Sequence, residues 1–193
     1  TDVRVFKGRE SAGVRGIKLE SKDQVISMAI LAHIEAAPAE RVTYVRQANM
    51  VRRGGADQEQ DVESEGNGQE VALSPERYAE LSAHEEFVLT VSENGYGKRT
   101  SAYEYRISGR GGKGIIGGAT KDDDFIEHMF VASTHDDLLC FTNTGRVFKI
   151  RVYELPELPR TSKGRPIVNF IDLKAGESVR AFLPVKNFEA GST

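Results

Sequence analysis

The sequence predicts an all-β protein made of repeated four-stranded units, interrupted once by a helical hairpin. Short runs rich in β-branched and aromatic residues are separated by Gly, Asn, Asp and Pro, as expected of strands joined by tight turns. A pattern of residues also recurs 50 positions further along the chain. A period of this length with several strands per unit is typical of propeller blades, and a β-sandwich is the alternative.

Composition narrows the class of protein. The chain of 193 residues is long enough for one core with an appendage, and its 39% hydrophobic and 28% charged residues are ordinary for a globular protein. The longest apolar run, Val25–Leu31, is far too short to span a bilayer, and the N-terminus carries no secretory signal. We therefore expect a soluble cytoplasmic protein without a membrane partner, in which the single cysteine, Cys140, is a buried thiol.

Residues 33–85 have the signature of a helical hairpin. Pro38 suits the first position of one helix, and Ser74 suits the N-cap of another. The tip between them, residues 54–70, carries six acids and no bases. Such a segment cannot bury a core, so we expect a disordered tether, with mimicry of phosphate in a basic groove as the alternative. The rest of the chain then carries a formal charge of +3, against −3 for the whole.

Two β-hairpins carry the repeat. Residues 87–106 align with residues 138–154, and Gly95 matches Gly145 in the two turns. The turns read Glu-Asn-Gly and Asn-Thr-Gly, in which we expect both Asn and Gly to adopt the positive φ of a tight turn. The units divide the chain into a partial blade, the helical insertion, a second blade, and a third blade with the C-terminal tail: residues 1–32, 33–85, 86–134 and 135–193.

Each unit also holds a basic, glycine-containing element that is followed by an apolar strand. The elements occupy residues 9–17, 106–115 and 160–167. The strands expected after them occupy residues 24–31, 125–132 and 178–185. Outside the insertion only 140 residues remain, fewer than three units at this spacing. Since closed propellers need about 4–8 blades, we expect an incomplete ring with exposed sheet edges.

The basic elements and the hairpins indicate an anionic partner. If each unit places its element at the same radial position, the clusters form a curved basic rim that suits the backbone of bent duplex DNA. Glycines beside the charges let backbone N–H groups approach a phosphate. The candidate DNA-binding residues are Arg9, Arg15, Lys98, Arg99, Arg106, Arg110, Gly111, Gly112, Lys113, Arg146, Lys149, Arg160, Lys163 and Arg165. Alternatively, these loops only turn corners in the β array and keep their charges in solvent.

Four stretches closely resemble the C-terminal domain of DNA gyrase A. They are Glu93–Thr100 (Glu-Asn-Gly-Tyr-Gly-Lys-Arg-Thr), Tyr103–Gly114, Gly145–Ile150 and Tyr153–Pro156 (Tyr-Glu-Leu-Pro). The resemblance covers nearly everything outside the acidic tip. It implies a β-pinwheel, a six-bladed propeller variant in which neighbouring blades exchange strands, and duplex DNA wrapped around its basic perimeter.

The signature heptapeptide of that family, the gyrase A box, runs Gln-Arg-Arg-Gly-Gly-Lys-Gly or close to it. This sequence has Ser-Gly-Arg-Gly-Gly-Lys-Gly at Ser108–Gly114, so the last five positions match and the first two differ. Residues 1–114 look like late blades of the family, whereas Gly117 onward looks like the segment that follows the box in the first blade. We therefore expect a partial domain with rearranged blade order.

The resemblance also implies the family reaction, ATP-dependent supercoiling of DNA by a type IIA topoisomerase. The catalytic tyrosine and the ATPase of that enzyme lie outside this chain, so we expect an accessory domain without catalytic residues or a cofactor. The implied partners are the rest of gyrase A and the gyrase B protein. The residues Asp122–Asp124, His128 and His135 could suggest a metal site, but the acids lie in a turn pattern and an Asp run is usually a solvated loop, so we expect no metal site there. The alternatives are a protein-interaction propeller fragment and a topoisomerase IV A-like domain that does not wrap DNA.

Overall fold

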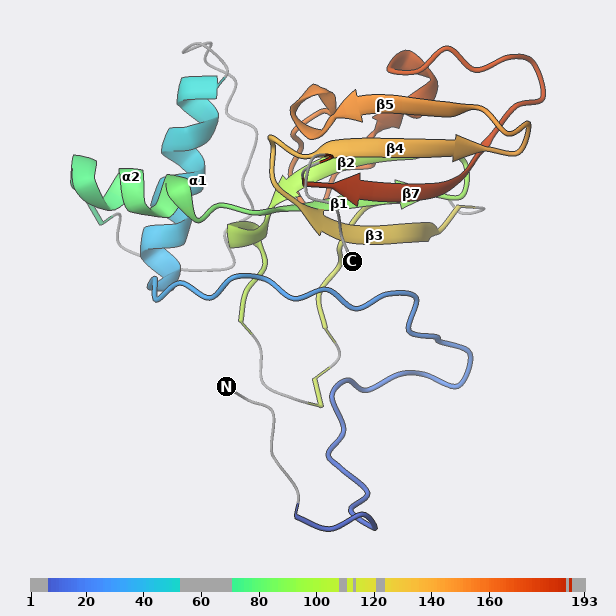
Figure 1. Ribbon diagram of the computed structural model, residues 1–193. Helices are drawn as coiled ribbons and strands as arrows, with labels where there is room; N and C mark the ends of the chain where they lie inside the picture. Colours follow the sequence, from blue (N-terminus) through green and yellow to red (C-terminus); the bar gives the residue numbers. More distant parts are fainter. Residues whose placement is uncertain are drawn as a thin grey trace.

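Two antiparallel sheets and two helices make up the main elements of the computed structural model (Figure 1), which describes residues 7–52, 71–107, 111–112, 114–120, 124–186 and 188. The helices lie at one end of the sheets, and the N-terminal segment runs as an extended trace past them (Figure 1). No helix in this described part is long and apolar enough to cross a membrane.

Blade 1 is the four-stranded sheet, with the strand order β3-β1-β2-β6. Its strands are β1 (Phe87–Ser92), β2 (Tyr96–Ser101), β3 (Ile126–Ala132) and β6 (Arg165–Pro166). Every residue of β1 is buried, because β2 and β3 pair with it on both sides. The outermost strand, β6, follows the second hairpin in sequence but pairs with the first, so the second unit donates a strand to the first, which is the kind of strand exchange that the resemblance implied.

Blade 2 is the three-stranded sheet, with the strand order β5-β4-β7. Its strands are β4 (Asp137–Thr142), β5 (Val147–Arg151) and β7 (Val179–Val185). The register repeats that of blade 1: β1 shifts register between Val91 and Ser92, and β4 shifts between Phe141 and Thr142. The 50-residue repeat of the sequence is therefore a structural repeat, although only one of the two sheets reaches four strands.

Two of the three predicted apolar strands are confirmed, as β3 and β7, and the third is wrong. Residues 24–31 form no strand, and Met28 and Ile30 are 85% and 86% exposed. Strands β3 and β7 each pair with the first strand of a hairpin, but no hairpin precedes residues 24–31 in the part of the chain that is described. Without a ladder partner, this segment forms no strand although its side-chain pattern is apolar.

The hairpin turns depend on glycine alone. Gly95 and Gly145 have φ values of 75° and 81°, as predicted. Among the described residues no other residue type has a positive φ, so the prediction for the turn asparagines is wrong. Asn94 instead donates its backbone N–H to Asp124 Oδ1 at 3.0 Å, which ties the turn to the segment that leads into β3.

The hydrophobic core lies between the two sheets. Buried side chains from both blades form one cluster that includes Leu89, Leu138, Cys140 and Ile167. Cys140 is fully buried, as predicted, and burial raises the pKa of its thiol to about 12. The Phe182 ring lies 6.2 Å from the Phe130 ring, so strands β7 and β3 contact each other across the two sheets.

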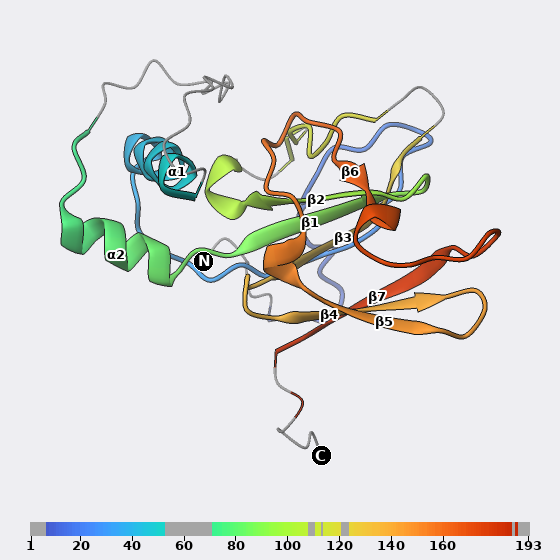
Figure 2. The same cartoon turned by 90° about the horizontal axis from the view of Figure 1, so that it is seen from above.

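The predicted helical hairpin supplies α1 (Pro38–Arg52) and α2 (Pro75–Ala83), seen from above in Figure 2. Ser74 caps α2 by accepting the backbone N–H of Arg77 at 3.2 Å, as its position predicted. The Tyr44 ring packs edge-on against the Tyr103 ring, whose centroid is 5.3 Å away, and this contact joins α1 to blade 1. The predicted acidic tip falls on residues outside the described ranges.

Candidate nucleic-acid interface

The exchanged element, residues 155–167, runs along the outer edge of blade 1. Its first part pairs with β2: Arg99 donates its backbone N–H to Pro156 O at 2.9 Å, and Leu158 donates to Arg99 O at 3.1 Å. Its last part is β6, after which Ile167 donates its N–H to Gly95 O at 2.8 Å. The third basic element of the sequence is therefore held on blade 1 at both ends.

Two glycines allow this close approach. A Cβ atom on Gly164 would lie 2.9 Å from Gly97 O, and Gly164 has a φ of 95°. A Cβ atom on Gly97 would lie 3.1 Å from Ile167 Cγ1. A side chain at Gly164 would therefore clash with the backbone of β2, whereas a side chain at Gly97 would require Ile167 to shift by a few tenths of an ångström.

Lys98 lies inside the protein, although the sequence marked it as a candidate for DNA contact. Its side chain is 1% exposed. The ammonium donates to the carbonyl oxygens of Pro159, Arg160 and Ser162, at 2.8, 2.6 and 2.7 Å. A lysine ammonium has three donors, and here all three are used within the protein.

Arg99 is also engaged internally. Its Nε donates to Leu155 O at 2.9 Å, and its Nη1 pairs with Glu157 Oε2 at 2.8 Å. The same glutamate pairs with Arg52 at the end of α1, at 2.6 Å. Both guanidinium groups lie over the Phe87 ring, with centroid distances of 4.8 Å for Arg99 and 5.3 Å for Arg52. This network docks α1 against blade 1 and the exchanged element.

Three cations are displayed by the exchanged element between residues 160 and 165. The Arg160 guanidinium donates to Ile116 O at 2.6 Å in an exposed position. The Lys163 ammonium lies 3.4 Å from the centroid of the Tyr96 ring, and Arg165 is exposed opposite Gly97. We call Arg160, Lys163 and Arg165 the edge cations. They lie close together in sequence and on one sheet edge.

Two candidate cations in the hairpin of blade 2, Arg146 and Lys149, lie apart from the edge cations in sequence. Arg146 pairs with Glu177 at 2.7 Å and lies over the Phe148 ring, with a centroid distance of 4.6 Å. Lys149 is 55% exposed and lies 3.8 Å from Asp137. Both therefore contact partners in the protein, yet each keeps part of its side chain in solvent.

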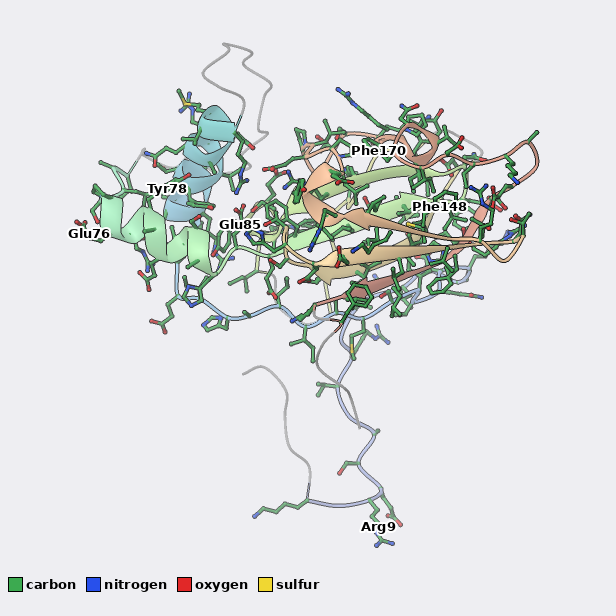
Figure 3. All side chains as sticks on the ribbon, turned by 45° about the horizontal axis from the view of Figure 1, so that its top comes forward. Arg9, Glu76, Tyr78, Glu85, Phe148 and Phe170 are labelled. Atoms are coloured by element: carbon green, nitrogen blue, oxygen red, sulfur yellow. The ribbon has the colours of Figure 1, made fainter. Side chains whose placement is uncertain are left out.

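The structure brings the other two basic elements side by side. Gly111 donates its N–H to Gly16 O at 2.8 Å, and Lys18 donates to Gly112 O at 3.0 Å, which makes a parallel bridge between Ile17 and Gly112. Arg15 and Arg106 are exposed near these glycines in sequence, and Arg9 lies at the far end of the N-terminal segment (Figure 3). Arg110 and Lys113, both candidates from the sequence, fall outside the described residues.

Glu104 is a site residue that sequence reasoning missed. Its Oε2 accepts the backbone N–H of Arg160 at 2.8 Å, which fixes the start of the edge-cation loop. Burial raises the pKa of this carboxyl, against the effect of that hydrogen bond. The matching Tyr-Glu pairs at residues 103–104 and 153–154 were visible in the repeat, but only the exchange of strands shows what Glu104 holds.

Asp124 has a structural role. Although burial acts to raise its pKa, hydrogen bonds from Ser92 and from the N–H groups of Asn94 and Phe125 hold that pKa below its usual value. Within the residues that the structure describes, no group of three His, Cys, Asp or Glu side chains could hold a metal ion.

Known proteins match this chain in several stretches. The family described as "DNA gyrase C-terminal domain, beta-propeller" matches residues 1–32, 86–133 and 136–186, which is more than half of the chain in three pieces. The DNA gyrase A protein of Granulibacter bethesdensis is 40% identical over 198 residues, which cover 97% of this chain and 21% of that protein. The DNA gyrase A protein of Fibrobacter succinogenes is 52% identical over 109 residues, covering 56% and 12%.

Among solved structures, "Structure of DNA gyrase A C-terminal domain" is 29% identical, covers 53% of this chain and 32% of that chain, and has a TM-score of 0.47. The chain spans 21% or less of the length of the two gyrase A proteins named above. With the family match over most of its length and sheets that do not close into a ring, the chain belongs, as a partial member, to the DNA gyrase C-terminal domain family of β-propellers.

Proposed function

We propose that this chain binds duplex DNA through phosphate contacts and wraps it, as the C-terminal domain of a DNA gyrase A protein. The observation that carries the proposal is the set of edge cations, which the exchanged element displays on the outer edge of blade 1. Arg and Lys side chains bind the phosphate backbone without reading bases. A set of cations on one sheet edge suits a duplex that passes along that edge.

The remaining contacts would come from the other basic elements. Arg15 and Arg106 are exposed, and the backbone of Gly111 and Gly112 joins the second element to the first. The other residues in the proposed contact set are Arg9, Arg110, Lys113, Arg146 and Lys149. Lys98 and Arg99 act differently, because their charged groups are bound inside the protein.

This role is that of an accessory domain. We propose that it supports ATP-dependent supercoiling together with the rest of gyrase A and the gyrase B protein, in the cytoplasm, and that cleavage and ATP hydrolysis take place in those other parts. The relatives named as DNA gyrase A proteins are much longer than this chain, which leaves room for the rest of a gyrase A protein.

Fluorescence anisotropy with a labelled duplex, measured across a salt series, tests the proposal. Phosphate binding predicts that log K falls linearly with log salt concentration, with a slope of about −0.9 per phosphate contact. The variant Arg160→Ala/Lys163→Ala/Arg165→Ala should bind more weakly and with a shallower slope. The matched control Lys174→Ala/Arg180→Ala/Lys186→Ala removes three exposed cations of blade 2 and should bind as the wild type does.

Two results would overturn the proposal. One is no binding of the wild-type chain at low salt. The other is a capture of protein partners with little dependence on salt, which would favour the protein-interaction alternative, because an interface built on apolar anchors responds weakly to salt.

A further inference from the structure

Strand β2 is built to receive the exchanged element. Gly97 makes room for Ile167, Lys98 binds three carbonyl groups, and Thr100 donates its hydroxyl to Leu158 O at 2.9 Å. In blade 2 the corresponding residues of β5 are Val147, Phe148 and Ile150, which cannot make these hydrogen bonds. The polar residues of β2 are therefore explained by the backbone that they hold.

Lys98 holds one particular turn of that backbone. The three carbonyl groups that it binds belong to residues 159–162, and Ser162 closes the same turn by donating both its N–H, at 3.0 Å, and its hydroxyl, at 2.8 Å, to Pro159 O. Glu104 also holds the turn, by accepting the backbone N–H of Arg160. The Lys98 ammonium therefore fixes the turn through three of its carbonyl groups, and the Glu104 carboxylate fixes it through the backbone N–H of Arg160.

The edge cations begin within this turn. The carbonyl of Arg160 is bound to Lys98 and its N–H to Glu104, so its backbone is fixed while its guanidinium reaches Ile116 O near the surface. Lys163 directly follows the turn, and Arg165 lies opposite Gly97. The positions of Arg160 and Lys163 therefore depend on the turn, and Arg165 follows it on β6, where the ladder with β2 also holds it.

We propose that Lys98 is a positioning residue for DNA binding, which acts from inside the sheet by holding the 159–162 turn so that the edge cations face the duplex together. This inference rests on the proposed function and assigns a role to a cation that touches no phosphate itself. Burying an ammonium is costly unless its donors are satisfied, and an apolar side chain fills the same position in blade 2. The buried lysine at this position is therefore explained by the 159–162 turn that it holds.

A double-mutant cycle separates positioning from direct contact. Lys98→Met should weaken duplex binding about tenfold. It should also reduce the slope of log K against log salt concentration by more than about 0.9, the amount that the loss of one direct phosphate contact would give. When the edge cations are already removed by Arg160→Ala/Lys163→Ala/Arg165→Ala, adding Lys98→Met should weaken duplex binding hardly any further. An equal effect in both backgrounds would mean that Lys98 acts independently of the edge cations and would overturn the proposal. The matched control Lys174→Met removes one exposed lysine of blade 2.

A second experiment uses the wild-type chain and does not depend on how a variant folds. Acetylation by an N-hydroxysuccinimide ester, followed by mass spectrometry, reports which lysines reach solvent. Lys163 should react quickly in the free protein and be protected by duplex DNA, whereas Lys98 should react slowly in both states. Rapid reaction of Lys98, with protection by DNA, would show a direct contact. If the wild type binds no DNA, the proposed function fails; if it binds but the cycle shows no coupling, only the positioning role fails.

Discussion

The two blades share a hairpin, a register and a bulge, but their outer strands differ. In blade 1, β2 is buried or half-buried throughout, because the exchanged element covers it. In blade 2, β5 alternates between exposed and buried positions, and none of the described strands pairs with its outer edge. An outer strand in this repeat is therefore buried only where the next unit donates an element that covers it. The side chains of β2 and β5 differ accordingly.

Polar residues show this most clearly. Lys98 and Thr100 are 1% and 0% exposed, and they occupy the positions of Phe148 and Ile150 in blade 2. A count of basic residues treats Lys98 and Lys163 alike, but Lys98 holds the backbone from inside the sheet, whereas Lys163 is half-buried over the Tyr96 ring at the sheet edge. In this fold, the basic residue Lys98 on the receiving strand holds the backbone of the exchanged element.

The largest expected effect tests burial in the two hairpins. Leu89 and Leu139 hold the same place in β1 and β4, but Leu89 is 0% exposed and Leu139 is only half-buried. We expect Leu89→Ala to lower the free energy of unfolding by about 2–5 kcal/mol, because it leaves a cavity, and Leu139→Ala to cost clearly less. Chemical denaturation measures both, and equal losses would contradict the difference in packing between the blades.

The next effect tests the close approach of the exchanged element. Gly164→Ala places a Cβ atom 2.9 Å from Gly97 O, whereas Gly145→Ala, at a similar positive φ, meets nothing within 4 Å. The strain of the positive φ is common to both, so we expect Gly164→Ala to cost about 2 kcal/mol more. It should also weaken duplex binding. Equal losses of unfolding free energy in the two variants would mean that the exchanged element does not lie as close to Gly97 as described.

A smaller effect appears in acid and belongs to blade 2. The backbone N–H of Lys174, the hydroxyls of Thr144 and Thr142, and the charge of Arg146 together lower the pKa of Glu177 to about 2, from 4.5. The stability that this carboxylate supplies is complete above pH 4.5 and is lost as the pH falls toward 2. In chemical denaturation between pH 6 and pH 2, the free energy of unfolding should therefore fall less steeply with pH for Glu177→Gln than for the wild type. The control Asp172→Asn, which removes an exposed carboxylate, should keep the wild-type slope.

The last expected effect is found in alkali and belongs to blade 1. Burial lowers the pKa of Lys98 to about 8, from 10.5, while Glu104 acts to raise it and Arg160 to lower it further. Between these two values the unfolded chain binds more protons than the folded one, so this residue makes stability rise with pH. The difference in unfolding free energy between the wild type and Lys98→Met should grow in favour of the wild type across this window. A constant difference would contradict the lowered pKa.

Local signals in the sequence predicted much of the fold. Strands β3 and β7, the cap at Ser74 and the positive φ of Gly95 follow from side-chain pattern and turn chemistry, which act over a few residues. The strand expected at residues 24–31 failed because a strand also needs a partner, and its apolar pattern cannot supply one. The rearranged order of blades inferred from the sequence stays a prediction.

The candidate site was predictable only in outline. The basic elements at residues 106–115 and 160–167 were visible as motifs, and the strand order shows that the second of them lies on blade 1. The sequence could not separate Lys98 and Arg99, whose charges are bound internally, from Lys163, because the distinction depends on a segment about 60 residues away. For the same reason Glu104, which holds Arg160 in place, was missed.

The most direct test of DNA binding along blade 1 is to ask which blade lies against the duplex. An iron chelate that generates hydroxyl radicals can be attached to a cysteine placed at Thr161, which is exposed in the edge-cation loop, or at Ala181, which is exposed on β7. Cys140 is fully buried and its thiol pKa is raised to about 12, so it should stay unlabelled. We expect Thr161→Cys to cleave bound duplex DNA strongly and Ala181→Cys to cleave it weakly. Equal cleavage from both sites, or stronger cleavage from Ala181→Cys, would contradict binding along the outer edge of blade 1.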